Sequence, residues 1–310
     1  MNADVSVVIP TRDRAALLVR TLRSVFAQRD VEVEVVVVDD GSRDDISAVV
    51  RGAGDGRVRL LRQERSQGVS AARNRGIDVS TGSWVAFLDD DDLWSPDKLR
   101  AQLDAAEAGG SRWSIAGTVN VDSDLRITGG GPPPSADEIA RNLPLRNTVV
   151  AGASNVIVRC DLLDRAGRFD ASLRHMADWD LWLRLGRAGA PAVVCRPLVA
   201  YGLHATNASL DWPEIPAELD VLEARYADER RGQPVDRAYV YRWLAWNALR
   251  AGSRRRTLRW YAAAARSGDL HSVGRAAVAM VRPSLAAGRA ARANTAWYAE
   301  ARQWLAELEP

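Results

Sequence analysis

The first hundred residues alternate short apolar runs, rich in β-branched side chains, with segments whose apolar residues recur at helical spacing. Strands are predicted at 5–9, 33–38, 57–61 and 84–88, and helices at 14–27, 42–50, 68–79 and 95–108. Strict alternation of strand and helix is typical of βαβ units, which align successive strands in parallel. We therefore expect an α/β fold, Rossmann-like, with a mostly parallel sheet flanked by helices.

The regularity weakens after residue 109. Further strands are predicted at 113–121 and 156–159, a helix at 179–187, and a mobile substrate-facing loop at GGGPPPS, 129–135. The strand pattern disappears from about residue 205, where the chain becomes rich in Ala, Arg, Leu and Trp. Helices are predicted there at 216–228, 236–251, 254–266, 273–281 and 295–307. The sequence thus predicts an α/β domain over 1–209, with halves at about 1–100 and 110–209, and an α-helical C-terminal extension over 210–310.

Composition narrows the class of protein. The chain has 310 residues, 47% of them hydrophobic, which excludes disordered, collagen-like and disulfide-scaffold proteins. Cys160 and Cys195 stand far apart, without the spacing of a metal site or redox motif. No basic leader precedes an apolar run, and no stretch reaches the roughly 18 apolar residues of a membrane span. We expect a cytoplasmic protein, with peripheral attachment to the inner face of the membrane left open.

Carboxylates follow the predicted strands at the points where each strand ends. The first strand runs into Pro10-Thr11-Arg12-Asp13, the second into Asp39-Asp40-Gly41-Ser42, and the fourth into Asp89-Asp90-Asp91-Asp92. The ends of parallel strands share one edge of a sheet, so these side chains should face a common crevice. Four consecutive aspartates suit a hard divalent cation such as Mg²⁺ or Mn²⁺. The alternative is a solvated loop that leads into a helix N-terminus, with Ser95-Pro96 as its cap.

Phosphate-binding motifs of other folds are absent. No G-x-G-x-x-G follows the first strand and no G-x-x-x-x-G-K-[ST] occurs, so a metal and arginines would have to hold any nucleotide phosphates. The Asp39–Ser42 segment has a plain structural interpretation as well. It could be a strand-to-helix turn with Ser42 as the N-cap and Asp44 or Asp45 in the first turn of the helix. One aspartate could still contact a base or ribose while its neighbour builds the turn.

Five segments, taken in order, resemble a known enzyme family. They are VSVVIPTRDR, VVVVDDGSRDD, GVSAARNRGI, GSWVAFLDDDDLWSPDKL and MADWDLWLRL. Their order and spacing over residues 5–209 resemble the successive motifs of family 2 glycosyltransferases with the GT-A fold. The resemblance implies that residues 1–100 form the nucleotide-sugar half and residues 110–209 the acceptor half of a catalytic domain.

The resemblance assigns roles to residues at the predicted sheet edge. It implies a donor pocket formed by Pro10, Thr11, Asp13, Asp39, Asp40, Arg73, Asp89 and Asp90. The DxD motif maps best onto Asp89–Asp91, with Asp91 the favoured metal ligand and Asp89 beside it. Which of the four aspartates touches the metal stays open. His204 matches a family histidine that could reach the metal or the diphosphate, although a lone histidine is more often an ordinary packed residue.

The resemblance also implies a catalytic base. The family's acidic pair before a WxLWLRL helix maps onto Asp178, and Ala177 stands where an acidic residue is common. The alternative for Asp178 is capping of the following helix. Asp180 is expected to interact with the helix dipole instead. His175 is a weaker candidate for the acceptor site.

The implied reaction is metal-dependent, inverting transfer of a sugar from a nucleotide-diphospho-sugar, foremost a UDP-sugar, to a hydroxyl. The acceptor would be a carbohydrate or a lipid-linked molecule in cell-surface polysaccharide or glycoconjugate synthesis, with Mn²⁺ or Mg²⁺ as cofactor. Two alternatives remain. A nucleotidyltransferase of related fold would need a lysine-containing loop after the first strand, which PTRDR lacks. A non-catalytic nucleotide- or sugar-binding module would explain Ala177 but not the retention of Asp91 and Asp178.

The charge of the chain is unevenly distributed. The net charge is +2, yet the stretch from Arg237 to Arg302 holds 13 arginines and only two acidic residues. Tryptophans at 243, 246 and 260 accompany the densest arginines, at 254–256 and 259. Such a surface is typical of a peripheral membrane anchor or a site for a polyprenyl-diphosphate acceptor. The alternative is that the tryptophans pack the helices and the arginines form a solvated face. No nucleic-acid-binding motif accompanies them.

Overall fold

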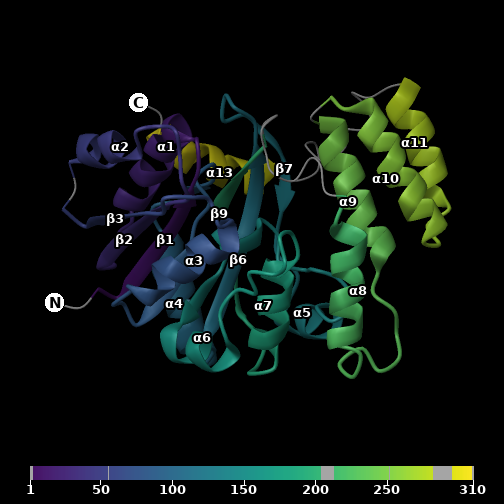
Figure 1. The fold of residues 1–310 in the computed structure, drawn as a ribbon, viewed down its shortest axis with the longest axis horizontal. Helices are drawn as coiled ribbons and strands as arrows, with labels where there is room; N and C mark the ends of the chain where they lie inside the picture. The colour runs from purple at the N-terminus through teal and green to yellow at the C-terminus, as the bar shows by residue number, and fades with distance from the viewer. Residues whose placement is uncertain (1–2, 55, 204–212, 251, 282–294, 309–310) are drawn as a thin grey trace.

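The structure is a computed structural model that describes residues 3–54, 56–203, 213–250, 252–281 and 295–308. A nine-stranded sheet lies at its centre in the order β3-β2-β1-β4-β8-β6-β9-β5, and β7 pairs with β6 off this path. Figure 1 shows helices packed around this sheet and a second group of helices, α8 to α11, at one side of it.

The strands run in two parallel groups. They are β1 Val5–Thr11, β2 Val33–Asp39, β3 Val58–Arg62, β4 Trp84–Phe87, β5 Leu93–Trp94, β6 Trp113–Val121, β7 Ile127–Gly131, β8 Ile157–Arg159 and β9 Ala192–Gly202. β1 to β4 are parallel to one another, and β9 is parallel to β6. β8 joins the groups by antiparallel pairing with β4 and β6, and β5 and β7 pair antiparallel with β9 and β6. The predicted α/β fold with a largely parallel sheet is confirmed.

Seven helices belong to this part of the chain. They are α1 Ala15–Phe26, α2 Ile46–Ala53, α3 Val69–Asp78, α4 Lys98–Gly109, α5 Ala136–Asn142, α6 Cys160–Ala166 and α7 Ala177–Gly186, with a 3-10 turn, η1, at Gly152–Asn155. Alternate residues of β1 and β2 face opposite sides of the sheet. Val7, Ile9 and Val35 pack with α1 and α2, whereas Val36 and Val38 pack with α3. The strands read as continuous apolar runs because helices cover both faces.

Two predicted helix starts are wrong by three or four residues. Ser42 does not cap a helix; α2 begins at Ile46, and Asp45 caps it by accepting from the backbone N of Ala48 at 2.9 Å. The Asp39 carboxylate instead accepts from the backbone N of Ser42 at 2.8 Å, which closes the turn. Likewise α4 begins at Lys98 with Asp97 in the N-cap position, so Ser95 and Pro96 precede the helix.

The predicted loop at 129–135 is largely ordered structure. Gly129–Gly131 belong to β7, which pairs with β6, and Ser135 forms a capping box with Glu138 at the start of α5. Glycine permits the strand because Gly130 has φ +109 and a Cβ there would lie 2.4 Å from the Thr118 carbonyl oxygen. The glycines of this segment therefore allow the close approach of β7 to β6, and residues 132–134 connect β7 to α5.

The C-terminal helices divide into two sets. α8 Ile215–Arg225, α9 Arg237–Arg250, α10 Arg254–Arg266 and α11 His271–Val281 form the group beside the sheet, and α13 Thr295–Glu307 returns to the sheet itself (Figure 1). In α13, the indole nitrogens of Trp297 and Trp304 donate to carbonyl oxygens of β6 and β9, at 3.1 and 2.8 Å. The predicted helical extension is thus present, and its last helix packs on the α/β part.

Lys98 is the only lysine of the chain, and its side chain is fully buried at the start of α4. Its Nζ lies 3.7 Å from the centroid of the Trp94 ring, and it has no hydrogen-bond partner among the described residues. Desolvation by burial lowers the pKa of Lys98 well below its ordinary value, although the ring face favours an ammonium. Burial therefore disfavours the charged form of Lys98 in the folded protein.

Lys98→Met is expected to stabilise the protein by about 1–2 kcal/mol at pH 7, because an apolar chain of similar length replaces an unpartnered amine. At pH values between the lowered pKa of Lys98 and its ordinary value of about 10.5, the unfolded state binds one more proton than the folded state. Wild-type stability should therefore rise with pH through this window, and the advantage of the variant should shrink. Urea unfolding at pH 7 and 9.5 measures both effects. Arg100→Met, on the exposed side of the same helix, is the control; equal effects of the two variants would contradict the explanation.

Candidate active site

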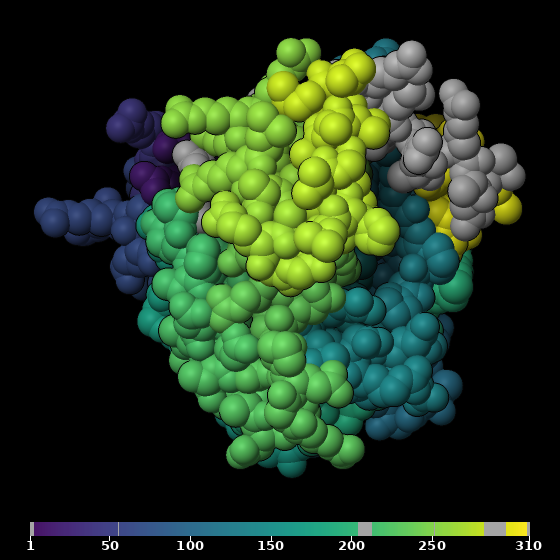
Figure 2. Space-filling view, turned by 90° about the vertical axis from the view of Figure 1, so that its right-hand side faces the viewer, coloured from purple at the N-terminus to yellow at the C-terminus, as the bar shows by residue number. Residues whose placement is uncertain are grey.

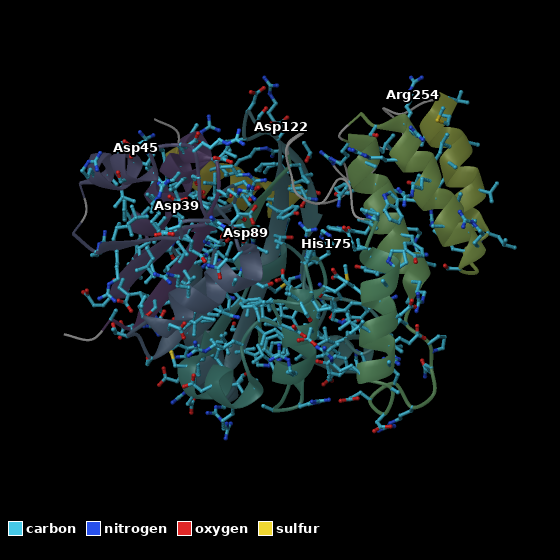
Figure 3. The ribbon with its side chains drawn as sticks, in the orientation of Figure 1. Asp39, Asp45, Asp89, Asp122, His175 and Arg254 are labelled. Carbon is cyan, nitrogen blue, oxygen red and sulfur yellow. The ribbon has the colours of Figure 1, made fainter. Side chains whose placement is uncertain are left out.

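Six aspartates, at 39–40 and 89–92, lie at the ends of β2 and β4 along one edge of the sheet. Asp39 ends β2 and Asp89 follows β4, with β1 between the two strands (Figure 3). The end of β1 contacts the segment after β4, because the Thr11 hydroxyl donates to Asp90 at 2.7 Å. The Asp13 backbone N donates to the Ser42 hydroxyl at 3.0 Å, although Asp13 itself is exposed. The predicted crevice residues after β1, β2 and β4 are therefore brought together, and Pro10 lies buried within β1 beside them.

Asp39 and Asp40 lie where the donor pocket is predicted, and their carboxylates bind the segments that surround it. Asp40 is 5% exposed, and its carboxylate accepts from four groups on the segment that precedes α3. The donors are the side chains of Gln63 and Ser66 and the backbone N–H groups of Gln67 and Gly68, at 3.2, 2.7, 2.7 and 3.0 Å. Asp39 accepts from Arg62 at 2.9 Å in addition to its own turn. Both aspartates thus hold loops in place around this edge.

Arg73 links the predicted base to the acidic run. Its side chain is 4% exposed on α3; one guanidinium nitrogen donates to Asp178 at 2.7 Å and another to Asp89 at 2.6 Å. The Phe169 ring lies 5.1 Å from the guanidinium carbon. A buried arginine between two carboxylates fixes both of them, because charge-assisted bonds of this kind are short and directional. Asp178 and Asp89, 89 residues apart in the chain, therefore share one counter-ion.

Asp178 is the second residue of α7, and Met176 occupies the N-cap position, so the capping interpretation of Asp178 is wrong. Burial raises the pKa of Asp178 above its ordinary value, Arg73 opposes the rise, and the charge of Asp89 adds to it. The carboxylate retains access, with 22% of its side chain exposed. An accessible carboxylate with a raised pKa is suited to accept a proton. Gly152 leaves it space, because a Cβ there would lie 3.0 Å from Asp178 Oδ2.

The aspartates at 89–92 point to different partners. The backbone N of Asp89 donates to the Ser154 hydroxyl, and Asp92, fully buried, accepts from the backbone N of Gly202 at 2.8 Å. One guanidinium nitrogen of Arg14 lies 3.0 Å from Asp90 and 2.7 Å from Asp91. Burial raises the pKa of Asp90 to about 6, and burial together with Asp91 raises the pKa of Asp92 well above its ordinary value. The run is therefore built structure rather than a solvated loop.

The donor set at Asp89–Asp91 fits a hard divalent cation. Asp90 and Asp91 already converge on a single cationic group, Arg14, and their oxygens are the ligands that Mg²⁺ and Mn²⁺ prefer. Within the described parts of the chain, no three His, Cys, Asp or Glu side chains are placed to hold a metal by themselves. Mg²⁺ is commonly held by one or two carboxylates together with substrate phosphates, so this set suffices for such a site. His204 lies outside the described residues.

Sequence reasoning missed the role of Asp180 and two other residues. Asp180 lies in the first turn of α7, as the dipole interpretation predicts, but it is also fully buried and bound by Arg184, Arg225 and the Tyr226 hydroxyl. Arg14 is the last residue of the PTRDR motif, and its position just after the first strand could have indicated a contact with the aspartates at the sheet edge. No local pattern pointed to Glu218, which accepts from the backbone N–H groups that precede α7. His175, the weaker acceptor candidate (labelled in Figure 3), supplies one of these N–H groups.

Comparisons with known proteins agree with this geometry. A family described as "Glycosyl transferase family 2" matches residues 6–167. The succinoglycan biosynthesis protein ExoO of Rhizobium meliloti is 34% identical over 67% of this chain, and the chain spans 62% of that protein's length. The Escherichia coli protein named UDP-Glc:alpha-D-GlcNAc-diphosphoundecaprenol beta-1,3-glucosyltransferase WfaP is 28% identical over 71% of this chain and 86% of its own.

Solved structures support the fold. Staphylococcus aureus TarS 1–349 in complex with UDP-GlcNAc has a TM-score of 0.61 and 16% identity, and the alignment covers 93% of this chain and 89% of that one.

The amylovoran biosynthesis glycosyltransferase AmsB of Erwinia amylovora, 31% identical over 63% of this chain and 68% of its own, is another relative in polysaccharide synthesis. The chain belongs to glycosyl transferase family 2 and is a glycosyltransferase enzyme.

Proposed function

We propose that this glycosyltransferase moves a sugar from a UDP-sugar to a hydroxyl of a carbohydrate or lipid-linked acceptor, with inversion and with the help of Mn²⁺ or Mg²⁺. The observation that carries the proposal is the Arg73 bridge, which holds Asp178 and Asp89 at one point of the sheet edge. The names of relatives support the substrates: WfaP is named for UDP-Glc and a diphosphoundecaprenol-linked acceptor, and TarS was solved with UDP-GlcNAc.

Asp178 would act as the base. It would accept the proton of the acceptor hydroxyl as that oxygen attacks the anomeric carbon, and the bond to the nucleotide diphosphate would break on the opposite side. A single displacement of this kind inverts the anomeric centre. Arg73 would keep Asp178 ionised and oriented while the acceptor enters.

The donor would lie across the strand ends. Pro10, Thr11, Asp13, Asp39 and Asp40 would shape the nucleotide pocket, with Asp39 or Asp40 exchanging part of its present contacts for the base and ribose. Asp91, supported by Asp89 and Asp90, would hold the divalent cation. A bound cation of this kind neutralises charge on the departing diphosphate.

A donor panel tests the proposal. Wild-type protein with Mn²⁺ is expected to hydrolyse or transfer from at least one UDP-sugar in a panel of UDP-, GDP- and TDP-sugars, to lose this turnover with EDTA, and to regain it with added Mn²⁺. The anomeric configuration of the product, read by NMR, reports inversion. The proposal fails if the protein binds nucleotide but Asp178→Asn and Asp91→Ala leave turnover unchanged.

We further propose that residues 237–302 attach the enzyme to an anionic membrane surface, mainly through α10 and α11. Trp260 does not supply the apolar contact, because it is buried and its ring stacks on that of Tyr241 with centroids 5.7 Å apart, whereas Trp243 is 36% exposed. Ser272 and Ala279 are the buried residues of α11, and exposed aliphatic side chains lie on and just before this helix. The exposed fractions are 76% for Leu270, which precedes α11, and 61% for Val273, 48% for Val278 and 79% for Val281.

Exposed arginines accompany these side chains on the neighbouring helix α10, which packs against α11. The exposed ones on α10 are Arg254, Arg255, Arg259 and Arg266. Figure 2 shows α10 and α11 forming the outermost surface of this side, and Figure 3 shows Arg254 at one end of it. Exposed aliphatic side chains beside arginines are typical of peripheral attachment to anionic lipid. Within the parts of the chain that the structure describes, no helix combines the length and apolarity needed to cross a bilayer.

Liposome flotation tests the attachment. The full chain is expected to float with phosphatidylglycerol vesicles and to remain unbound with phosphatidylcholine vesicles. Val273→Asp together with Val281→Asp should lower the floating fraction at least five-fold, because both substitutions place charge in the apolar contact. Val19→Asp on α1, exposed far from α11, is the matched control. Equal flotation of the wild type and all variants would contradict the proposal.

A further inference from the structure

The C-terminal helix α8 binds the chain at two places, one just before the active-site helix α7 and one within it, and these two places flank Asp178. The first place lies just before α7, where Glu218 of α8 accepts from three consecutive backbone N–H groups. Those of Arg174, His175 and Met176 donate to its carboxylate at 2.9, 3.0 and 2.9 Å. Glu218 is only 7% exposed, so these bonds are shielded from water.

The second place lies just after Asp178. Arg225 and Tyr226, at the C-terminal end of α8, bind the buried carboxylate of Asp180 at 2.6 and 2.7 Å. Apolar residues between the two places, Leu219 and Leu222, lie in the same buried cluster as Trp179 and Trp182. α8 therefore holds α7 on both sides of the proposed base.

The opposite side of the same segment is held by α3, the helix that carries Arg73. Asn74 exchanges two hydrogen bonds with the backbone of Phe169, at 2.8 and 3.0 Å, and Ser70 donates to the Leu173 carbonyl at 3.4 Å. The segment 169–176 thus lies between α3 and α8. The position of this segment therefore determines where the Asp178 carboxylate lies relative to the Arg73 guanidinium.

From these contacts we infer that Glu218 is a positioning residue for catalysis: α8 completes the active site by fixing the start of α7, and with it the Asp178 carboxylate. Three amides on one carboxylate form a strong anchor, since hydrogen bonds to a charged acceptor are about twice as strong as neutral ones. The negative charge also suits the N-terminal end of α7. The inference rests on the proposed role of Asp178 as the base.

Glu218→Gln tests the inference with little change of shape. A glutamine has a single acceptor oxygen, so at least one of the three N–H groups would face its amide nitrogen. We expect kcat to fall about 10- to 100-fold, the scale of a misplacement of roughly 1 Å, with the donor KM within two-fold of wild type. Hydrogen–deuterium exchange should accelerate across residues 172–180. Asp220→Asn removes an exposed carboxylate of the same helix that pairs with Arg237, and it should change neither kcat nor exchange at 172–180.

The possible outcomes separate clearly. Faster exchange at 172–180 with kcat within two-fold of wild type would overturn the inference, because Glu218 would then hold the fold without affecting catalysis. A parallel loss of kcat and donor binding would overturn it as well. If Glu218→Gln does not fold, Tyr226→Phe, which removes one hydroxyl from the second place, is judged by the same kcat and exchange criteria. An active Asp178→Asn enzyme would instead show that the assignment of the base has failed.

Discussion

Asp178→Asn is expected to lower kcat by about 10²- to 10⁴-fold, the usual contribution of a general base. The amide keeps the shape of the carboxylate and one acceptor for Arg73, but it cannot take the proton of an attacking hydroxyl. Donor binding should stay within two-fold of wild type, because the proposed donor pocket is built by the strand ends. Steady-state kinetics on the donor found in the panel, with nucleotide binding measured by calorimetry, separates the two effects.

The pH profile gives an independent reading of the same variant. A base works only when ionised, so the wild-type rate should rise with pH through the pKa of Asp178. That pKa is raised by burial, so the acidic limb should lie above the range of an ordinary aspartate. Asp178→Asn should abolish this limb. Asp164→Asn, an exposed carboxylate on α6, is the matched control and should keep both the rate and the limb. A variant of Asp178 with wild-type kcat would refute its assignment as the base.

Arg73→Met is expected to destabilise the protein by about 3 kcal/mol at pH 8. Removing one partner of a buried ion pair leaves its carboxylates without a counter-ion, which costs far more than the loss of a surface pair. Here two carboxylates, Asp89 and Asp178, lose the same arginine. The loss should be visible as a lower urea midpoint with an unchanged m-value.

The pH dependence of this loss follows from the same contact. Without Arg73 the pKa of Asp178, already raised by burial, rises further, so the folded variant binds more protons than the unfolded chain at mildly acidic pH. The destabilisation should therefore be largest at pH 8 and shrink toward pH 5. Arg126→Met, which breaks the exposed pair with Asp124, should cost less than about 1 kcal/mol at either pH. Equal losses at pH 5 and 8 would contradict the explanation.

Much of the first half of the molecule could be predicted from the chain alone. β1, β2 and β4 are continuous apolar runs because both faces of the sheet are covered, and the period of the intervening helices is clear. Parallel connections then require the strand ends to share one edge. The grouping of Thr11, Asp39 and Asp90 follows from this rule without knowledge of any side-chain contact.

Helix starts and the glycine-rich strand could not be read in the same way. Asp45 and Ser42 are both good N-cap residues, and the choice depends on the Asp39 carboxylate, which binds the backbone of Ser42. Gly129–Gly131 have the composition of a loop, yet they pair with β6 because glycine allows the backbones to approach. Such outcomes depend on neighbours that are distant along the chain.

Periodicity and motif order along the chain are enough to predict the α/β order of elements, the sheet edge at which the aspartates gather, and Asp178 as the residue to test. How these residues are held depends on packing between distant elements: Arg73 lies between Asp89 and Asp178, Arg14 between Asp90 and Asp91, and Glu218 before α7. The physical reason is the range of the interactions. Apolar periodicity and strand ends are local properties, whereas an ion pair between residues 73 and 178 or a cap from residue 218 exists only after the elements have packed.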